Sequence, residues 1–154
     1  MQRKIQWIVT LLAWVMVGGV ASADIESVEI DGEQRHFTLT KIPEDVFELV
    51  VGEYLYEGKE APIVRLNRDG TGVFQPHTKQ DVTIKWWIQS EADGTLEMLT
   101  PPNGNRVMVL IYQIQESPAN LQRSWAPGSY SRSQLAIWKE PRRVTISGER
   151  QKPY

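Results

Sequence analysis

Few residues of this sequence belong to the types that carry out catalysis. The chain has two histidines, His36 and His77, and no cysteine that could serve as a thiol nucleophile. His36 lies beside Phe37 in an expected strand and His77 follows Pro76 in an expected loop, positions that are typical of surface or rim residues. The motifs of serine hydrolases, zinc peptidases and phosphate-binding loops do not occur. These observations favour a non-catalytic protein.

A metal site and a pair of catalytic carboxylates have little support in the pattern. The two histidines could meet in the fold and bind a metal together with Asp81 or Glu53, but no spacing of a known ligand set connects them. The carboxylates are dispersed over turns and polar faces, where solvated surface charge is their common role, and no pair is singled out for glycoside hydrolysis. We predict no metal and no cofactor, and a hydrolase or isomerase of unfamiliar type stays open as an alternative.

The aromatic residues are more informative, above all the adjacent pair Trp86 and Trp87. Residues 82–89 alternate between two faces, as a half-buried antiparallel strand does. One face carries Val82, Ile84, Trp86 and Ile88, and the other carries Thr83, Lys85, Trp87 and Gln89. We expect Trp86 to point into the core and Trp87 to be exposed as a surface contact, where an indole can stack on a sugar, a peptide or a partner protein. Replacing Trp86 should then destabilise the fold far more than replacing Trp87.

Two hairpins are predicted before this strand. Residues 63–67 and 72–75 flank Arg68-Asp69-Gly70-Thr71, in which Asp-Gly provides the positive φ angles of a tight turn. The other hairpin is expected around Asp31-Gly32. We expect its two strands to form an N-terminal ribbon that lies against the main sheet.

A short helix is expected over residues 43–50, between the two hairpins. Pro43 suits the first helical position, and the carboxylates of Glu44 and Asp45 complement the helix dipole. The helix is at most two turns long. Its apolar set could close one end of a barrel and consists of Ile42, Val46, Phe47 and Val50.

The rest of the chain continues the pattern of short strands. The expected strands are 95–100, 106–115, 121–126, 130–139 and 142–147, separated by turn residues. The segment 106–115 is apolar on both faces over its first half, which indicates a central strand or one covered by another element. About nine or ten short strands without a long helix predict an all-β fold. Sequential hairpins favour a single antiparallel up-and-down barrel, because closure removes exposed edges.

Residues 1–23 have the three regions of a secretory signal peptide. Arg3 and Lys4 precede a long apolar run, and Ala21-Ser22-Ala23 is the small-residue pattern that signal peptidase accepts. An uncleaved membrane anchor is the alternative, since the run is only a little shorter than the roughly 20 residues that span a bilayer.

Cleavage after residue 23 would leave 131 of the 154 residues, enough for one domain with a core. We expect one barrel domain over residues 24–147 and a loose tail over 148–154, in the periplasm or outside the cell, with no stable membrane insertion. The chain has 17 basic and 19 acidic residues, and loss of Arg3 and Lys4 leaves 15 against 19, a net charge of −4. This balance argues against nucleic acid as a partner.

A family resemblance rests on three short segments. Leu49-Val50-Val51-Gly52-Glu53-Tyr54 is followed by the hairpin Asp69-Gly70-Thr71-Gly72 and by Ile84-Lys85-Trp86-Trp87. Together they resemble the small bacterial lipocalin-like (calycin) barrels, in which a short helical turn precedes Gly-x-Trp and the tryptophan plugs the closed end. Here tyrosine stands in place of that tryptophan, and the family's later arginine has no counterpart. The resemblance covers residues 42–112 and implies an eight-stranded barrel whose open end holds a small apolar ligand.

We therefore expect an exported, non-catalytic protein that binds a small hydrophobic or amphipathic ligand inside the barrel. The ligand-binding residues expected on the inner face are Tyr54, Trp86, Met108 and Tyr112. The alternative is a filled barrel that acts through protein contacts, as an inhibitor or an envelope-assembly subunit, with Trp87 and the loops at the contact. Residue volumes alone do not separate a hollow barrel from a filled one.

The signal peptide gives the first testable prediction. The mature protein should begin at Asp24 and be soluble after export. N-terminal sequencing of the exported protein should return Asp-Ile-Glu. A sequence starting at Met1, from material that stays with membranes after salt and alkali washing, would contradict it.

Overall fold

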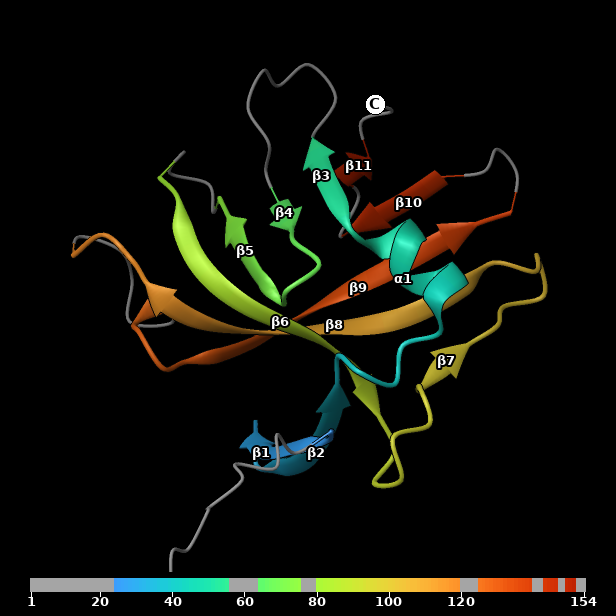
Figure 1. Ribbon diagram of the computed structural model, residues 1–154, viewed down its shortest axis with the longest axis horizontal. Helices are drawn as coiled ribbons and strands as arrows, with labels where there is room; N and C mark the ends of the chain where they lie inside the picture. Colours follow the sequence, from blue (N-terminus) through green and yellow to red (C-terminus); the bar gives the residue numbers. More distant parts are fainter. Residues whose placement is uncertain are drawn as a thin grey trace, which may run out of the picture.

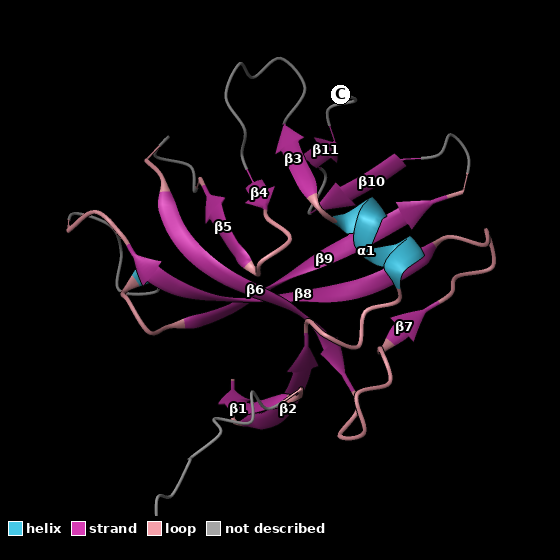
Figure 2. Cartoon of the chain, viewed as in Figure 1, coloured by secondary structure: helices cyan, strands magenta, loops and turns pink. Residues whose placement is uncertain are grey.

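The computed structural model describes residues 24–55, 64–75, 80–119, 125–139, 143–146 and 149–151. Figure 1 follows the chain, and Figure 2 shows that strands dominate it. The elements are β1 (Glu26–Ile30), β2 (Glu33–Thr38), α1 (Glu44–Val50), β3 (Gly52–Leu55), β4 (Val64–Leu66), β5 (Thr71–Phe74), β6 (Val82–Ser90), β7 (Met98–Leu99), β8 (Arg106–Glu116), β9 (Tyr130–Trp138), β10 (Arg143–Ile146) and β11 (Glu149–Gln151). The expected signal peptide, residues 1–23, lies outside the described residues.

Eight strands of the described chain pair into a ring and form a nearly closed antiparallel barrel (Figure 1). Their order is β3, β4, β5, β6, β8, β9, β10 and β11, and each strand pairs with the next one in this order. The pairing of β11 with β3 brings the ring back to its start. The prediction of an all-β, up-and-down barrel with a short helix before its first strand is confirmed.

The ring includes a strand that the hydrophobic pattern did not reveal. Residues 149–151 form β11, which pairs with β10 and β3, so the prediction of a loose tail from residue 148 is wrong for these residues. A short polar strand can form without an apolar pattern, because its hydrogen bonds come from the main chain. The strand expected at 121–126 is also wrong in its described part, since Trp125 and Ala126 lie in a turn before β9. Residues 121–124 lie outside the described residues.

The interior of the barrel is filled by side chains from alternate positions of the strands. The inward residues of β6 are Val82, Ile84, Trp86 and Ile88, and those of β8 are Met108, Leu110, Tyr112 and Ile114. All eight belong to one buried cluster. Burial of a large apolar side chain stabilises a fold by roughly 1.5–3 kcal/mol, so this cluster is the main source of stability.

Helix α1 packs against this core with the face that its sequence predicts. Ile42, Val46 and Val50 are buried in the interior cluster. The ring of Phe47 stacks on that of Trp86, with 5.9 Å between the ring centroids. The apolar set of the helix therefore covers part of the barrel interior.

A cation joins the helix to the turn between β4 and β5. The guanidinium of Arg68 forms ion pairs with Glu44 and Glu48 and lies 5.2 Å from the centroid of the Phe47 ring. These side chains are more than half exposed, and exposed ion pairs contribute at most about 1 kcal/mol each. The contact holds the turn in place and adds little to the overall stability.

The β4–β5 turn uses two glycines for different reasons. Gly70 has a φ angle of 81°, and the backbone N–H of Asn67 donates to the carbonyl oxygen of Thr71 at 2.9 Å. Gly72 is required by close approach, because a Cβ at this position would lie 2.3 Å from the carbonyl oxygen of Arg65 on β4. The hairpin predicted from Asp-Gly is confirmed.

The N-terminal ribbon is a hairpin attached to the end of β6. Asp31 and Gly32 have φ angles of 55° and 78°, the positive pair that a two-residue hairpin turn requires. Strand β2 pairs with β6 between Thr38↔Ile88 and His36↔Ser90, and the hairpin lies at the bottom of Figure 1. A second buried cluster forms where it meets the outer face of the barrel and consists of Ile30, Phe37, Trp87 and Ile111. The predicted ribbon against the main sheet is confirmed.

The close approach at Gly72 gives a prediction with a matched control. Gly72→Ala should lower the free energy of unfolding by about 3 kcal/mol, because the new methyl group meets backbone that cannot move aside. Gly32→Ala, at a positive φ but with no heavy atom within 4 Å of the new Cβ, should cost only about 1 kcal/mol. Urea denaturation followed by circular dichroism measures both. Equal costs for the two variants would contradict the tight approach of β4 and β5.

Candidate functional site

The four residues predicted for the barrel interior lie together in the interior cluster. Tyr54, Trp86, Met108 and Tyr112 have exposed fractions of 0, 0, 0 and 3%. The Tyr54 hydroxyl donates a hydrogen bond to the carbonyl oxygen of Val50, and burial raises the pKa of Tyr54. The indole N–H of Trp86 donates to the carbonyl oxygen of Asn67 at 3.0 Å. The polar atoms of Tyr54 and Trp86 are thus hydrogen-bonded within the barrel. The four side chains pack within one core.

Tyr112 also belongs to a stack of three aromatic rings. The Phe74 ring lies 5.1 Å from the Tyr112 ring and 5.3 Å from the Trp125 ring, all nearly parallel. Phe74 and Trp125 are only partly buried, and Phe74 is the last residue of β5. Sequence reasoning missed this stack, because Trp125 reaches it from a turn and not from the expected strand.

The prediction of an exposed Trp87 is wrong. Trp87 faces away from the barrel interior, as the alternation of β6 predicts, but it is only 8% exposed. The ring of Phe37 lies 5.1 Å from the Trp87 ring, and Ile111 completes the contact from β8. Period-2 alternation assigns a residue to a face, but it does not say which distant segment covers that face.

A gap in the pairing of β6 opens a cavity beside the two tryptophans. On one edge of β6, β5 pairs with Val82–Lys85 and β2 pairs with Ile88–Ser90. Trp86 and Trp87 lie between these partners, and there the Trp86 backbone N–H donates to the carbonyl oxygen of Gly70 at 2.8 Å. The neighbouring strands thus end on either side of the tryptophan pair.

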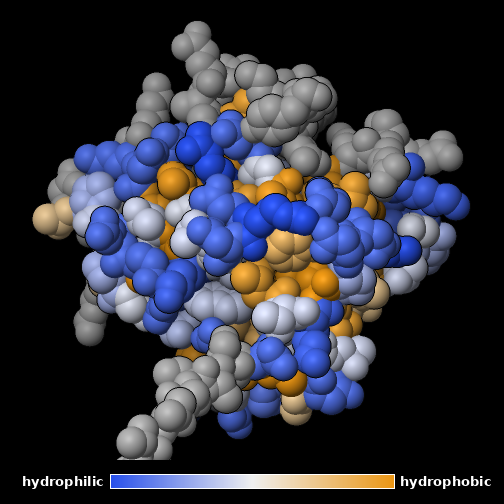
Figure 3. Space-filling view, in the orientation of Figure 1, coloured by the Kyte–Doolittle hydropathy of each residue, from blue (hydrophilic) through white to orange (hydrophobic). Residues whose placement is uncertain are grey.

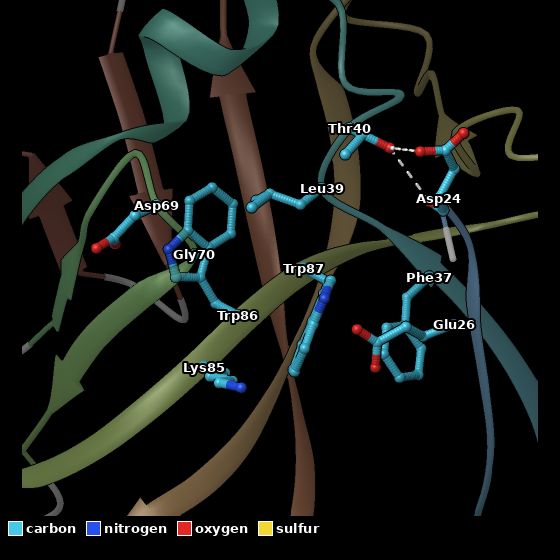
Figure 4. Close-up of a pocket in the computed structure, with 10 residues that line it drawn as sticks. All are labelled: Asp24, Glu26, Phe37, Leu39, Thr40, Asp69, Gly70, Lys85, Trp86 and Trp87. Atoms are coloured by element: carbon cyan, nitrogen blue, oxygen red, sulfur yellow. Dashed lines mark hydrogen bonds between the residues drawn. The ribbon is translucent and has the colours of Figure 1, made fainter. Parts of the chain in front are cut away.

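The cavity at this gap has a volume of about 210 Å³, and we call it the β6 groove (Figure 4). Its walls come from three segments: the N-terminal segment Asp24–Thr40, residues Lys85–Trp87 of β6, and Asp69-Gly70 of the β4–β5 turn. It lies below the 300–1,000 Å³ typical of drug-sized pockets, at about two thirds of the lower bound. The groove therefore suits a molecule no larger than an amino acid or a simple sugar.

The groove combines an apolar wall with a charged rim. Phe37 and Leu39 line it together with the tryptophans, and the charged residues are Asp24, Glu26, Asp69 and Lys85. Hydrogen bonds from the Thr71 hydroxyl and backbone N–H lower the pKa of Asp69, which stays ionised at neutral pH. Burial and, to a lesser extent, the negative charge of Glu26 raise the pKa of Tyr130.

The indole N–H of Trp87 is an open donor in the wall of the groove. The side chain of Trp87 is more than nine-tenths buried, but its indole N–H is accessible and makes no hydrogen bond with any residue in the described part of the chain. Because Trp87 lines the groove, a molecule in it can supply the missing acceptor.

Outside the groove, the described residues offer little for metal binding and a few apolar side chains at the surface. Within the described residues, no group of three His, Asp or Glu side chains is arranged to hold a metal, and His77 lies outside these residues. The exposed large apolar side chains there are Met98 and Leu99 of β7. Figure 3 shows that apolar residues also reach the surface between α1 and the N-terminal hairpin, with charged residues around them. The β6 groove combines a cavity with apolar, polar and charged side chains, and we take it as the candidate site.

Comparison with known proteins gives no match. No protein-family model matches the sequence, and no curated protein or solved structure matches the chain at a significant level. In the part of the chain that the structure describes, no helix is long and apolar enough to cross a membrane. The function is therefore inferred from the geometry of the groove.

The burial of Trp87 changes the expected mutant stabilities. Trp86→Ala should lower the free energy of unfolding by about 3–5 kcal/mol. Trp87→Ala should lower it by only about 2–3 kcal/mol, because the cavity left by the Trp87 side chain opens onto the groove and admits water. Leu99→Ala is a control at a side chain that is 66% exposed and should cost less than about 0.5 kcal/mol. Chemical denaturation measures all three. A Trp87→Ala cost as small as that of the control would show that the hairpin does not cover this indole.

Proposed function

We propose that this chain is a non-catalytic, lipocalin-like binding protein of the periplasm or the extracellular space, and that it holds a small amphipathic molecule in the β6 groove. The nearly closed up-and-down barrel with a short helix before its first strand supports the lipocalin-like part of this proposal. Export is supported by the pattern of residues 1–23.

The observation that carries the proposal is the Trp87 indole in the wall of the groove. Its ring, with that of Phe37, offers an apolar surface, and its N–H offers an unpartnered donor. Apolar walls with a few convergent polar groups are characteristic of small-molecule sites. The charged rim then favours a molecule that is apolar at one end and polar at the other.

The groove is a better place for the ligand than the interior around Trp86. There the side chains of Tyr54, Trp86, Met108 and Tyr112 pack in one core, and a ligand would have to displace them. In the groove, a ligand would only displace water. The alternative function through protein contacts loses Trp87 as its contact residue, because this side chain is covered by the hairpin.

Proton–nitrogen NMR spectra of the tryptophan indoles can test the location of the site. Titration with 3-phenylpropanol should produce a saturable shift of the Trp87 indole signal, which Trp87→Phe assigns by removing it. Trp125→Phe, which removes an indole outside the groove, should leave the binding constant unchanged. A saturable shift confined to the Trp86 indole would place the ligand inside the barrel and contradict the groove. The absence of any saturable shift would contradict small-molecule binding by these residues.

A further inference from the structure

The charges of the β6 groove carry an inference about the class of ligand, which rests on the proposed function. We infer that the groove selects a small zwitterion with an apolar body, such as an aromatic α-amino acid, with its ammonium group at Glu26 and its carboxylate at Lys85 and the Trp87 indole N–H.

The first observation is that two opposite charges share the groove without pairing. Glu26 belongs to β1 and Lys85 to β6, and Figure 4 shows them on either side of the Trp87 ring. Neither side chain forms an ion pair or a hydrogen bond with any residue that the structure describes. Opposite charges held apart across one cavity offer complementary sites to a molecule that carries both signs.

The second observation is the arrangement of donors on β6. Lys85 and Trp87 are two positions apart and so lie on the same face of the strand. The ammonium of Lys85 and the unpartnered N–H of Trp87 are both donors, and a carboxylate has two oxygens that can accept from both. A hydroxyl or an ammonium group on the ligand would satisfy this pair less well.

The other two carboxylates in the groove have partners of their own. The Asp24 carboxylate accepts a hydrogen bond from the Thr40 hydroxyl at 3.3 Å and lies 4.0 Å from the ammonium of Lys41. The Asp69 carboxylate accepts from Thr71, and Figure 4 shows it directed away from the Trp87 ring. Among the three carboxylates of the groove, Glu26 is thus the one without a hydrogen bond or an ion pair to any described residue.

Four probes with the same phenyl body separate the contributions of charge. L-phenylalanine carries both charges and phenethylamine only the positive charge. 3-Phenylpropanoate carries only the negative charge, and 3-phenylpropanol is uncharged. Titration at pH 7 and low salt, followed at the Trp87 indole signal, should show L-phenylalanine binding at least about fivefold more tightly than each of the others. Added salt should reduce this preference, because the rim is partly exposed.

Two charge-neutralising variants assign the two ends of the ligand. Glu26→Gln should weaken the binding of L-phenylalanine and of phenethylamine by about fivefold and leave the binding of 3-phenylpropanoate unchanged. Lys85→Gln should weaken the binding of L-phenylalanine and of 3-phenylpropanoate and leave the binding of phenethylamine unchanged. Glu116→Gln, at an exposed residue that does not line the groove, is the control and should change none of the constants.

The outcomes separate this inference from the proposed function. Phenethylamine binding as tightly as L-phenylalanine would show a cation site and overturn the zwitterion, while small-molecule binding stands. Equal binding of all four probes would likewise overturn the charge selection alone. No saturable shift with any probe would overturn both.

Discussion

The structure depends on β6 being covered on both faces and changing its partner along one edge. Its inner face builds the barrel core with β8, and its outer face is buried under the N-terminal hairpin. Its first half pairs with β5 and its end pairs with β2, so the barrel and the hairpin meet on one strand. The two tryptophans lie at that junction. One is the largest fully buried side chain of the interior, and the other anchors the hairpin.

This double use of β6 explains why the candidate site lies outside the barrel. Between the start of β5, which pairs with Lys85, and the end of β2, which pairs with Ile88, no described strand pairs with this edge of β6, and the space becomes the β6 groove. Three segments far apart in the sequence supply its walls. Each segment is fixed by an independent interaction: the hairpin by the Phe37–Trp87 contact, the β4–β5 turn by Arg68, and β6 by the core.

Much of the fold could be predicted from local signals in the sequence. The Asp-Gly pairs at residues 31–32 and 69–70 predict both hairpins, because only a few residue types adopt positive φ angles readily, and Asp31, Gly32 and Gly70 have such angles in the structure. Pro43 and the carboxylates after it predict α1, and the apolar alternation of β6 assigns Trp86 and Trp87 to opposite faces. Strand β11 escaped prediction because it is short and polar and depends on main-chain pairing.

The site was less predictable, since its features arise from contacts between distant segments. The sequence indicated Trp87 as important, but on the assumption that it was exposed, and its cover comes from a hairpin some 50 residues earlier in the chain. One signal was available: the segment 106–115 is apolar on both faces over its first half, and Ile111 is indeed buried under the hairpin. Glu26 and Lys85 gave no signal, because isolated charges on strands are ordinarily solvated.

The contact between Phe37 and Trp87 is the most direct measure of the central claim, that the hairpin covers the outer face of β6 and thereby forms the groove. Nuclear Overhauser effects between the two side chains can be recorded on the ligand-free protein. With ring centroids 5.1 Å apart, strong effects between the Phe37 ring protons and the Trp87 indole are predicted. Their absence, together with a Trp87 indole as accessible to a soluble paramagnetic agent as free tryptophan, would contradict the account.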